Sequence, residues 1–302
     1  MKIAVIAHIY YTDLIEEFIN YFQNLPVGTD FHISTTAESE QKVKNDFLNF
    51  FDEAHVHVIG VENRGVDIAS FVMFYKKIYS QYDLICKVHT KKENRVGFLD
   101  GWRLYLLENL LGSKKIVDKI ISEFQSDNML GVIFPEHFYF INNWIDWGNN
   151  FNRAHELMRK IGLDISSYEV EFPSGSMFWF RPAALISLNK LNLEPIDFKQ
   201  ANEYAPDGLL EHAIERIFLY LAEVNGFYWK KVLFQPLLKK DYKVQTYSKS
   251  ILDHLSITNK NILVLTGSLR GYEAELQSTT AELQSTTAEH QSTTAEPVSK
   301  TH

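Results

Sequence analysis

The chemistry that the sequence suggests most clearly is anion binding at residues 87–92, which read KVHTKK. Lys87, His89 and Lys91 alternate along what we expect to be the end of a strand, so their side chains share one face. Two cations and a histidine at the carboxyl edge of a parallel sheet suit a diphosphate. A solvated basic loop is the alternative for Lys91 and Lys92, whereas Lys87 lies within an apolar run.

Two other segments offer groups that bind anions. In residues 61–69, Gly65 lets the backbone turn closely and Asp67 can cap a helix, whose exposed N–H groups attract anions. An ordinary strand–helix turn explains the same residues. Arg103 can clamp a phosphate through its planar guanidinium or form a surface ion pair, and we weigh the two evenly.

Acidic residues gather at the start of a long helical pattern, residues 208–225. Asp207 stands where a capping residue would stand, and also where a general base would stand. Glu211 and Glu215 lie four residues apart on one helical face, and His212 follows Glu211 directly. Either Asp207 or Glu211 can serve as the base, and the sequence does not decide between them.

Aromatic side chains beside small or amide residues indicate carbohydrate binding in two places. A Ser-Gly-Ser run precedes an apolar strand with a tryptophan that can stack against a sugar face. Residues 138–150 interleave two more tryptophans with Asn and Asp, although a loop anchored by its own rings is an equal alternative. The candidate residues are Ser174, Gly175, Ser176, Trp179, Trp144 and Trp147.

An alternation of strands and helices must position these residues. Apolar runs predict strands at residues 3–7, 31–34, 55–59, 84–88, 131–134 and 177–180. Helical periodicity predicts helices at residues 14–22, 40–51, 68–78, 103–124, 152–161 and 208–225. The pattern predicts an α/β fold with a mostly parallel central sheet and helices on both faces. In such sheets ligands bind at the carboxyl ends of the strands.

Composition limits the class of protein. The 302 residues are 45% hydrophobic, which supports a full apolar core, and the net charge of -8 argues against nucleic-acid binding. A single cysteine, Cys86, excludes an intrachain disulfide and fits a reducing cytoplasm. The N-terminal apolar run ends at His8 and is too short for a signal peptide or a membrane span. The sequence contains no Asp-x-Asp, P-loop, dinucleotide-binding glycine pattern or zinc-type spacing.

The end of the chain differs in kind. From Ala274 a seven-residue unit, AELQSTT, recurs with at most one Leu per unit and a Ser-Thr-Thr run, which is a poor helix former. We therefore expect a disordered or weakly helical tail. The predicted domains are a main domain at residues 1–240, an extension at 241–272 and a low-complexity tail at 273–302.

Six motifs in order resemble the rhamnan synthesis protein F family. They are residues 63–68 (NRGVDI), 87–92 (KVHTKK), 102–103 (WR), 131–135 (GVIFP), 174–179 (SGSMFW) and 207–216 (DGLLEHAIER). The resemblance runs from Met1 to about Phe234. Proteins of this family resemble glycosyltransferases that build rhamnose-containing cell-wall polysaccharides, O-antigens and capsules, and the layout resembles a glycosyltransferase-A fold.

The resemblance implies an inverting transfer of rhamnose, galactofuranose or another hexose from a nucleotide-sugar donor to a glycan or lipid-linked glycan acceptor. Such an enzyme would be cytoplasmic, at the inner face of the membrane or within a synthesis complex. The expected donor-binding residues are His8, Asn63, Arg64, Gly65, Asp67, Lys87, His89, Thr90, Lys91 and Arg103. The expected catalytic residues are Asp207, Glu211 and His212, and those for the acceptor are Trp144, Trp147, Ser174, Gly175, Ser176 and Trp179.

Two questions stay open at this point. The glycosyltransferase-A fold places a metal-binding Asp-x-Asp after the fourth strand, where this sequence has VHTK at residues 88–91. We expect Lys87, His89 and Lys91 to supply the positive charge that Mg²⁺ or Mn²⁺ would otherwise supply, and metal use is the alternative. A non-catalytic carbohydrate-binding or assembly subunit is the alternative function.

Overall fold

The computed structural model describes residues 1–92, 99, 101–168, 170–203, 205–233 and 243–245. The chain divides into two units, Met1–Thr258 and Asn259–His302, and every described residue belongs to the first. The predicted tail at 273–302 lies outside the described residues, as does the predicted extension at 241–272 apart from residues 243–245. The three domain boundaries therefore remain predictions.

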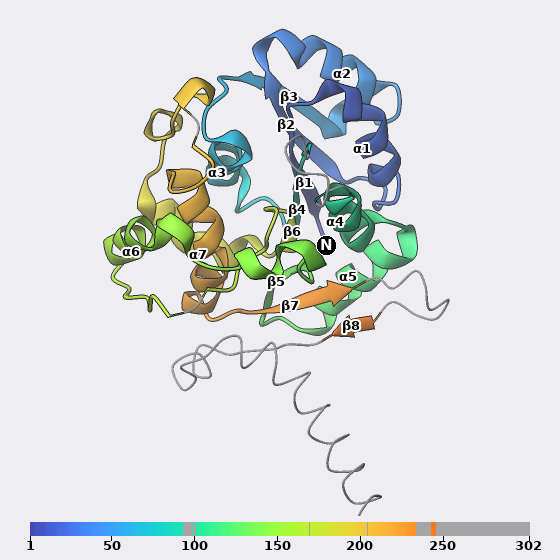
Figure 1. Cartoon of the computed structure of the whole chain (residues 1–302). Coiled ribbons are helices and arrows are strands. Elements are labelled where there is room, and N and C mark those ends of the chain that lie inside the picture. Colours follow the sequence, from blue (N-terminus) through green and yellow to red (C-terminus); the bar gives the residue numbers. More distant parts are fainter. Residues whose placement is uncertain (93–98, 100, 169, 204, 234–242, 246–302) are drawn as a thin grey trace, which may run out of the picture. The chain divides into compact units, whose positions relative to one another are not determined.

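The strands of the described residues form one eight-stranded sheet in the order β3-β2-β1-β4-β6-β5-β7-β8 (Figure 1). β3, β2, β1 and β4 run parallel to one another, and β5 runs parallel to β7. β6 is antiparallel to both of its neighbours, and β8 is antiparallel to β7. The strand bounds are β1 (Ile3–Ile9), β2 (Asp30–Thr36), β3 (Val56–Val61), β4 (Leu84–His89), β5 (Leu130–Pro135), β6 (Phe178–Phe180), β7 (Tyr228–Leu233) and β8 (Lys243–Gln245).

Helices connect the strands, and short 3₁₀ turns supplement them. The α-helices of the described residues are α1 (Ile15–Phe22), α2 (Glu40–Leu48), α3 (Val66–Ile78), α4 (Trp102–Leu111), α5 (Lys114–Ser126), α6 (Phe151–Lys160) and α7 (Leu210–Val224). The 3₁₀ turns are η1 (Thr12–Leu14), η2 (Ala37–Ser39), η3 (Glu53–His55), η5 (Tyr139–Trp144), η6 (Gly148–Asn150), η7 (Pro182–Leu191), η8 (Pro195–Asp197) and η9 (Ala201–Glu203). None of the helices in these described parts is long and apolar enough to cross a bilayer.

The two faces of the sheet pack against different helices, because alternate residues of a strand point to opposite faces. In β1, Ala4 and Ile6 join a core with α3, α6 and α7, whereas Val5 and Ala7 join a core with α1, α2, α4 and α5. Figure 1 shows the two helical layers on either side of the strands. The prediction of an α/β fold with helices on both faces of a mostly parallel sheet is therefore confirmed.

The structure departs from the sequence prediction in three elements, one of which is the short strand β8 that the sequence did not predict. The helix predicted at residues 103–124 is two helices, because α4 ends at Gly112 and the side chain of Ser113 caps α5 by accepting a hydrogen bond from the backbone N–H of Ile116 at 3.3 Å. β7 was not predicted, although it extends the sheet beside β5.

Candidate functional site

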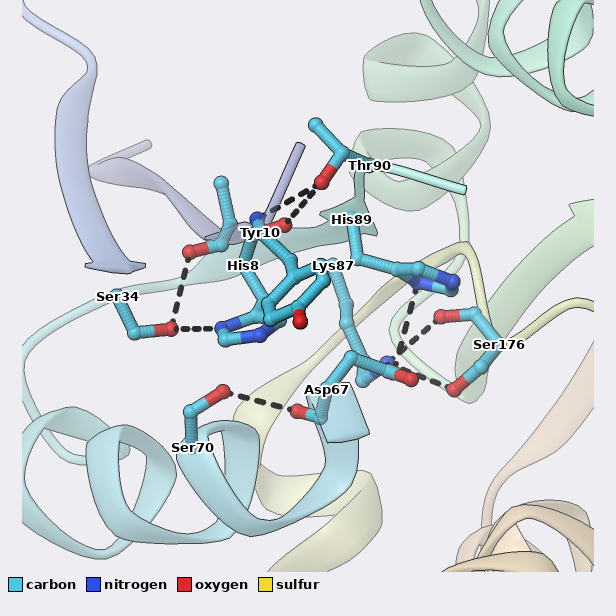
Figure 2. A network of polar contacts seen from close by, with 10 residues as sticks. His8, Tyr10, Ser34, Asp67, Ser70, Lys87, His89, Thr90 and Ser176 are labelled. Carbon is cyan, nitrogen blue, oxygen red and sulfur yellow. Dashed lines mark hydrogen bonds and ion pairs between the residues drawn. The ribbon is translucent and has the colours of Figure 1, made fainter. Parts of the chain in front are cut away.

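The order of the strands reverses between β1 and β4. From β1 the chain proceeds to β2 and β3 on one side and then returns to β4 on the other side of β1. In open α/β sheets, ligands bind outside the carboxyl ends of the strands at such a point. His8 of β1 and His89 of β4 are register partners there. Figure 2 shows both rings beside a buried polar cluster of Asp67, Lys87 and Ser176.

Lys87 is the centre of this cluster, and its side chain is only 1% exposed. Its ammonium donates to Asp67 Oδ2 and, at 2.7 Å each, to the carbonyl and hydroxyl oxygens of Ser176. An ammonium has three protons, so each has an acceptor within the protein. The expectation that Lys87 binds a diphosphate directly is therefore wrong, because its charge is already paired in the interior.

The two histidines are neutral at neutral pH. Burial lowers the pKa of His8 to about 4, and burial lowers the pKa of His89 to about 3, in both cases against the opposing charge of Asp67. His8 Nδ1 is 2.9 Å from the hydroxyl of Ser34. His89 Nδ1 is 3.5 Å from Asp67 Oδ2 and has no hydrogen-bond partner among the described residues. Of the three positive charges expected from Lys87, His89 and Lys91, that of Lys87 is paired with Asp67 and His89 is neutral, which leaves Lys91.

Asp67 holds the cluster together from the first turn of α3. Gly65 precedes the helix with a φ of 56°, where a Cβ would lie 2.4 Å from Phe198, so glycine is required at this turn. Burial acts to raise the pKa of Asp67, but the charge and the hydrogen bond of the Lys87 ammonium oppose burial, and the pKa is lowered on balance. Asp67 is thus an ionised partner of Lys87.

The other expected cations lie nearer the surface. Lys91 Nζ lies 4.1 Å from the ring centroid of Trp102 and forms no ion pair with a described residue. Lys92 is paired with Asp13. Arg103 donates to Glu17 at 2.8 and 3.2 Å and to the carbonyl of Lys91. Lys91 is therefore the cation of this loop that best matches the expected donor-binding role.

Thr90 stabilises the backbone at the same carboxyl edge of the sheet. Its hydroxyl accepts hydrogen bonds from the backbone N–H groups of Tyr10 and Tyr11 at 2.8 and 3.0 Å. These bonds tie the loop that follows β1 to the end of β4 (Figure 2). The binding role expected for Thr90 stays a prediction.

The acidic residues before and within α7 have different environments. Asp207 accepts hydrogen bonds from the backbone N–H of Asn149 at 2.7 Å and from the side-chain amide of Asn150. Burial acts to raise the pKa of Asp207, but these hydrogen bonds and the charge of Arg216 lower it on balance. A carboxylate so engaged is a weak base, and Asp207 instead fixes η6 to the start of α7.

The carboxylate of Glu211 has a different environment from that of Asp207. It is 3% exposed, and its Oε2 has no hydrogen-bond partner among the described residues. Burial raises the pKa of Glu211, and the charge of Asp67 raises it further. His212 Nδ1 accepts a hydrogen bond from the backbone N–H of Leu209 at 3.2 Å, which helps to begin the helix. Glu211 thus combines deep burial with a carboxylate oxygen that has no hydrogen-bond partner among the described residues, and its catalytic role stays a prediction.

Two expected acceptor-binding tryptophans lie in the interior instead. Trp179 is fully buried and donates its indole N–H to the carbonyl of Leu110 at 3.1 Å. Trp147 is 6% exposed and stacks on Tyr220 of α7. Neither ring is available to a sugar, so these two assignments are wrong. Trp144 is 51% exposed.

The turn after β3 also differs from the expectation. Arg64 donates to Glu62 at 2.7 Å and to the carbonyl of Phe198 at 3.2 Å, so it holds a neighbouring loop. Asn63 is partly buried in the same turn, and its role stays a prediction.

A second buried polar cluster lies at the carboxyl ends of β5 and β7, and the sequence analysis missed it. His137 is 2.8 Å from the Ser174 hydroxyl through Nδ1 and 2.5 Å from Glu171 through Nε2. Lys231 pairs with Glu171 at 2.9 Å and with Glu136 at 3.2 Å. Burial acts to raise the pKa of Glu171, but Lys231 and His137 lower it to about 2. Lys231 lies next to Lys230 in the sequence YWKKVL, and this pair of lysines hides the apolar pattern that marks Lys87 as buried.

The Ser-Gly-Ser turn joins the two clusters. Ser174 contacts the second cluster and Ser176 contacts Lys87 of the first, with Gly175 between them. Gly175 and Ser176 have φ values of 81° and 57°. The turn therefore couples the ends of β4 and β5 structurally, and the acceptor-binding role expected for its three residues stays a prediction.

The residues present do not fit a divalent metal. The position of the Asp-x-Asp holds His89 and Lys91, and no group of three or more His, Cys, Asp or Glu side chains in the described parts of the chain has a metal-binding arrangement.

The fold and the reversal of strand order define an α/β protein with a buried polar cluster at the carboxyl edge of its sheet. The chain matches the family described as "Rhamnan synthesis protein F" over residues 1–227, and it belongs to that family. Two curated relatives, both called "Uncharacterized protein WxcX" and from two strains of Xanthomonas campestris pv. campestris, are 31% identical over 225 residues. The match covers 74% of this chain and 31% of each relative. The resemblance drawn from the six motifs is thus confirmed.

Proposed function

We propose that this protein is a glycosyltransferase that moves a sugar from a nucleotide-sugar donor to a growing polysaccharide, with inversion at the anomeric carbon. The buried carboxylate of Glu211 carries the proposal, because its Oε2 has no partner among the described residues. An unpaired buried carboxylate is costly, and such groups cluster at functional sites. Membership in a rhamnan synthesis family supports a polysaccharide as the product.

In this proposal Glu211 is the general base. It accepts the proton of an acceptor hydroxyl while that oxygen bonds to the anomeric carbon, and the bond from this carbon to the diphosphate breaks on the opposite face. The raised pKa of Glu211 makes its carboxylate a stronger base. Neutral His89 acts as a hydrogen-bond donor to the departing diphosphate, and Lys91 supplies charge.

We extend the proposal to the fold, which we take to be of the glycosyltransferase-A type. The half from β1 to β4 alternates strands with helices and presents the ligand edge, and the mixed half that follows supplies α7 and its base. The family points to rhamnose as the transferred sugar, and galactofuranose and other hexoses are the alternatives.

Substitution of Glu211 tests the proposal. We expect Glu211→Gln to lower kcat by about 10²–10⁴-fold, because the amide cannot accept the proton. The measurement is nucleoside diphosphate release from a panel of sugar nucleotides in the presence of a rhamnose-containing oligosaccharide. In the wild type, kcat/KM should fall as the pH drops through the pKa of Glu211, which burial raises above 4.5.

Two further variants serve as controls. Glu156→Gln changes an exposed carboxylate of α6 and should leave kcat unchanged. Asp207→Asn should mainly lower stability, because it weakens the attachment of η6 to α7. Wild-type turnover by Glu211→Gln would overturn the assignment of the base. Absence of turnover with every donor would favour the carbohydrate-binding subunit instead.

A further inference from the structure

The segment between β5 and α6, residues 138–150, presents three large aromatic side chains to solvent. Tyr139 is 78% exposed, Phe140 is 53% exposed and Trp144 is 51% exposed. All three belong to the single short turn η5. Exposure of large aromatic rings to water costs solvation free energy, and exposed apolar side chains gathered in one turn mark interaction sites.

Residues 138–150 are anchored to the rest of the fold at their start, middle and end. At its start, the ring of Phe138 packs on Tyr105, with 5.4 Å between centroids. In its middle, Ile141 is buried in the core. At its end, Arg216 donates to the carbonyl of Asp146 at 2.9 Å, and Asp207 accepts from the backbone of Asn149. The exposed rings therefore have fixed positions, which reduces the entropy lost when a ligand stacks on them.

The anchoring also places the segment beside the proposed base. Asp207 precedes Glu211 by four residues and Arg216 follows Glu211 by five residues on α7, so the end of the segment is attached on both sides of Glu211 in the sequence. A polymer lying along η5 would reach the same edge of the sheet.

The polar residues of the segment favour a neutral glycan over a membrane. Asn142 and Asn143 are exposed between the rings and offer both donors and acceptors to sugar hydroxyls. Residues 138–150 contain Asp146 and no Lys or Arg, whereas surfaces that bind anionic lipid are rich in basic side chains. Sugar rings, and above all deoxyhexoses with a methyl group, present C–H faces that stack on aromatic rings.

We propose that Tyr139, Phe140 and Trp144 form the surface that binds the acceptor polysaccharide, with Asn142 and Asn143 binding its hydroxyls. The designation of this glycan as the acceptor rests on the proposed function, but its binding requires neither a donor nor turnover. The surface suits a chain of several residues rather than a monosaccharide, because the rings follow one another along a turn of six residues.

Titration of a rhamnose oligosaccharide into the full-length protein, followed by calorimetry without donor, tests the proposal. We expect the triple variant Tyr139→Ala/Phe140→Ala/Trp144→Ala to weaken binding at least tenfold. The matched controls Phe50→Ala and Tyr168→Ala remove aromatic side chains that are 56% and 88% exposed elsewhere, and should retain wild-type affinity. Circular dichroism verifies that each variant is folded.

Any one of three other outcomes would contradict the proposed glycan-binding surface. These outcomes are no binding of the oligosaccharide by the wild type, unchanged affinity of the folded triple variant, or binding to phosphatidylglycerol vesicles that the triple variant loses while glycan binding persists. The proposed function fails separately: glycan binding that depends on the three rings, without turnover of any sugar nucleotide, would retain the surface and exclude the enzyme.

Discussion

Lys87 and Asp67 are a pair of opposite charges within an apolar layer. The ammonium lies 5.3 Å from the ring centroid of Phe71 and 5.9 Å from that of Phe178, and water cannot replace a lost partner there. We expect Lys87→Met to lower the free energy of unfolding by about 3–5 kcal/mol, because it leaves the carboxylate of Asp67 buried without its ammonium. Urea unfolding followed by circular dichroism measures this loss.

The control for this prediction is an ion pair on the surface. Lys42 pairs with Asp46 one turn along α2, and Lys42→Met should change stability by less than about 0.5 kcal/mol. The double variant Asp67→Asn/Lys87→Met should be more stable than Lys87→Met alone, since no buried charge is left over. Equal losses for Lys87→Met and Lys42→Met would contradict the buried pair.

At the scale of elements, the turn between the two polar clusters depends on glycine. At Gly175 a Cβ would lie 2.6 Å from Leu106 and 3.2 Å from Trp102, at a φ of 81°. We expect Gly175→Ala to lower stability by about 1–3 kcal/mol, because it adds overpacking to backbone strain. Gly162→Ala is the matched control, with a φ of 82° and no neighbour within 4 Å, and should cost less. Thermal unfolding compares the two, and equal shifts in Tm would refute the steric account.

The elements differ in how well the sequence predicts them. β1 to β4 and their helices were predictable, because each apolar run is local and bounded by turn residues or polar residues. β7 was not, because Lys230 and Lys231 interrupt its apolar pattern. Both are buried, and the acidic residues that pair with them lie far away in the sequence. The hydrophobic pattern of a short segment cannot reveal that a charged side chain within it is neutralised by a residue far away in the sequence.

The candidate site was also only partly predictable from the sequence. Residue types and strand ends identified Asp67, Lys87 and His89 as one group. Their charge state was not predictable, because it depends on burial and on the pairing of a strand with a helix twenty residues earlier. The choice between Asp207 and Glu211 likewise needed the position of η6, which the sequence does not reveal.

At the scale of the whole molecule, buried histidines make stability depend on pH. Burial lowers the pKa of His8 and His32 from 6.5 to about 4, and that of His89 to about 3. Below pH 6.5 the unfolded chain therefore binds protons that the folded chain does not, so stability falls as the pH falls. We expect a loss of up to about 1.4 kcal/mol per pH unit for each ring as the pH drops from 6 to 4. Urea midpoints at several pH values measure this slope.

Replacement of the His89 ring tests whether the buried histidines cause this pH dependence of stability. His89→Gln removes one of the three contributions and should make the slope shallower. Below pH 4.5 a further loss begins, because Glu171, whose pKa is lowered to about 2, stays ionised in the folded chain while it binds a proton in the unfolded chain. Constant stability between pH 7 and pH 5 would contradict burial of these rings.

The short antiparallel strand β6 determines which motions the molecule can make. Among the described strands it alone bridges the parallel block of β1 to β4 and the block of β5 and β7. Its three residues, Phe178, Trp179 and Phe180, are fully buried, two on one face and one on the other. Separation of the two blocks would expose all three rings to water at a cost of several kcal/mol. We therefore expect the two blocks of strands to stay together as one rigid sheet when a ligand binds.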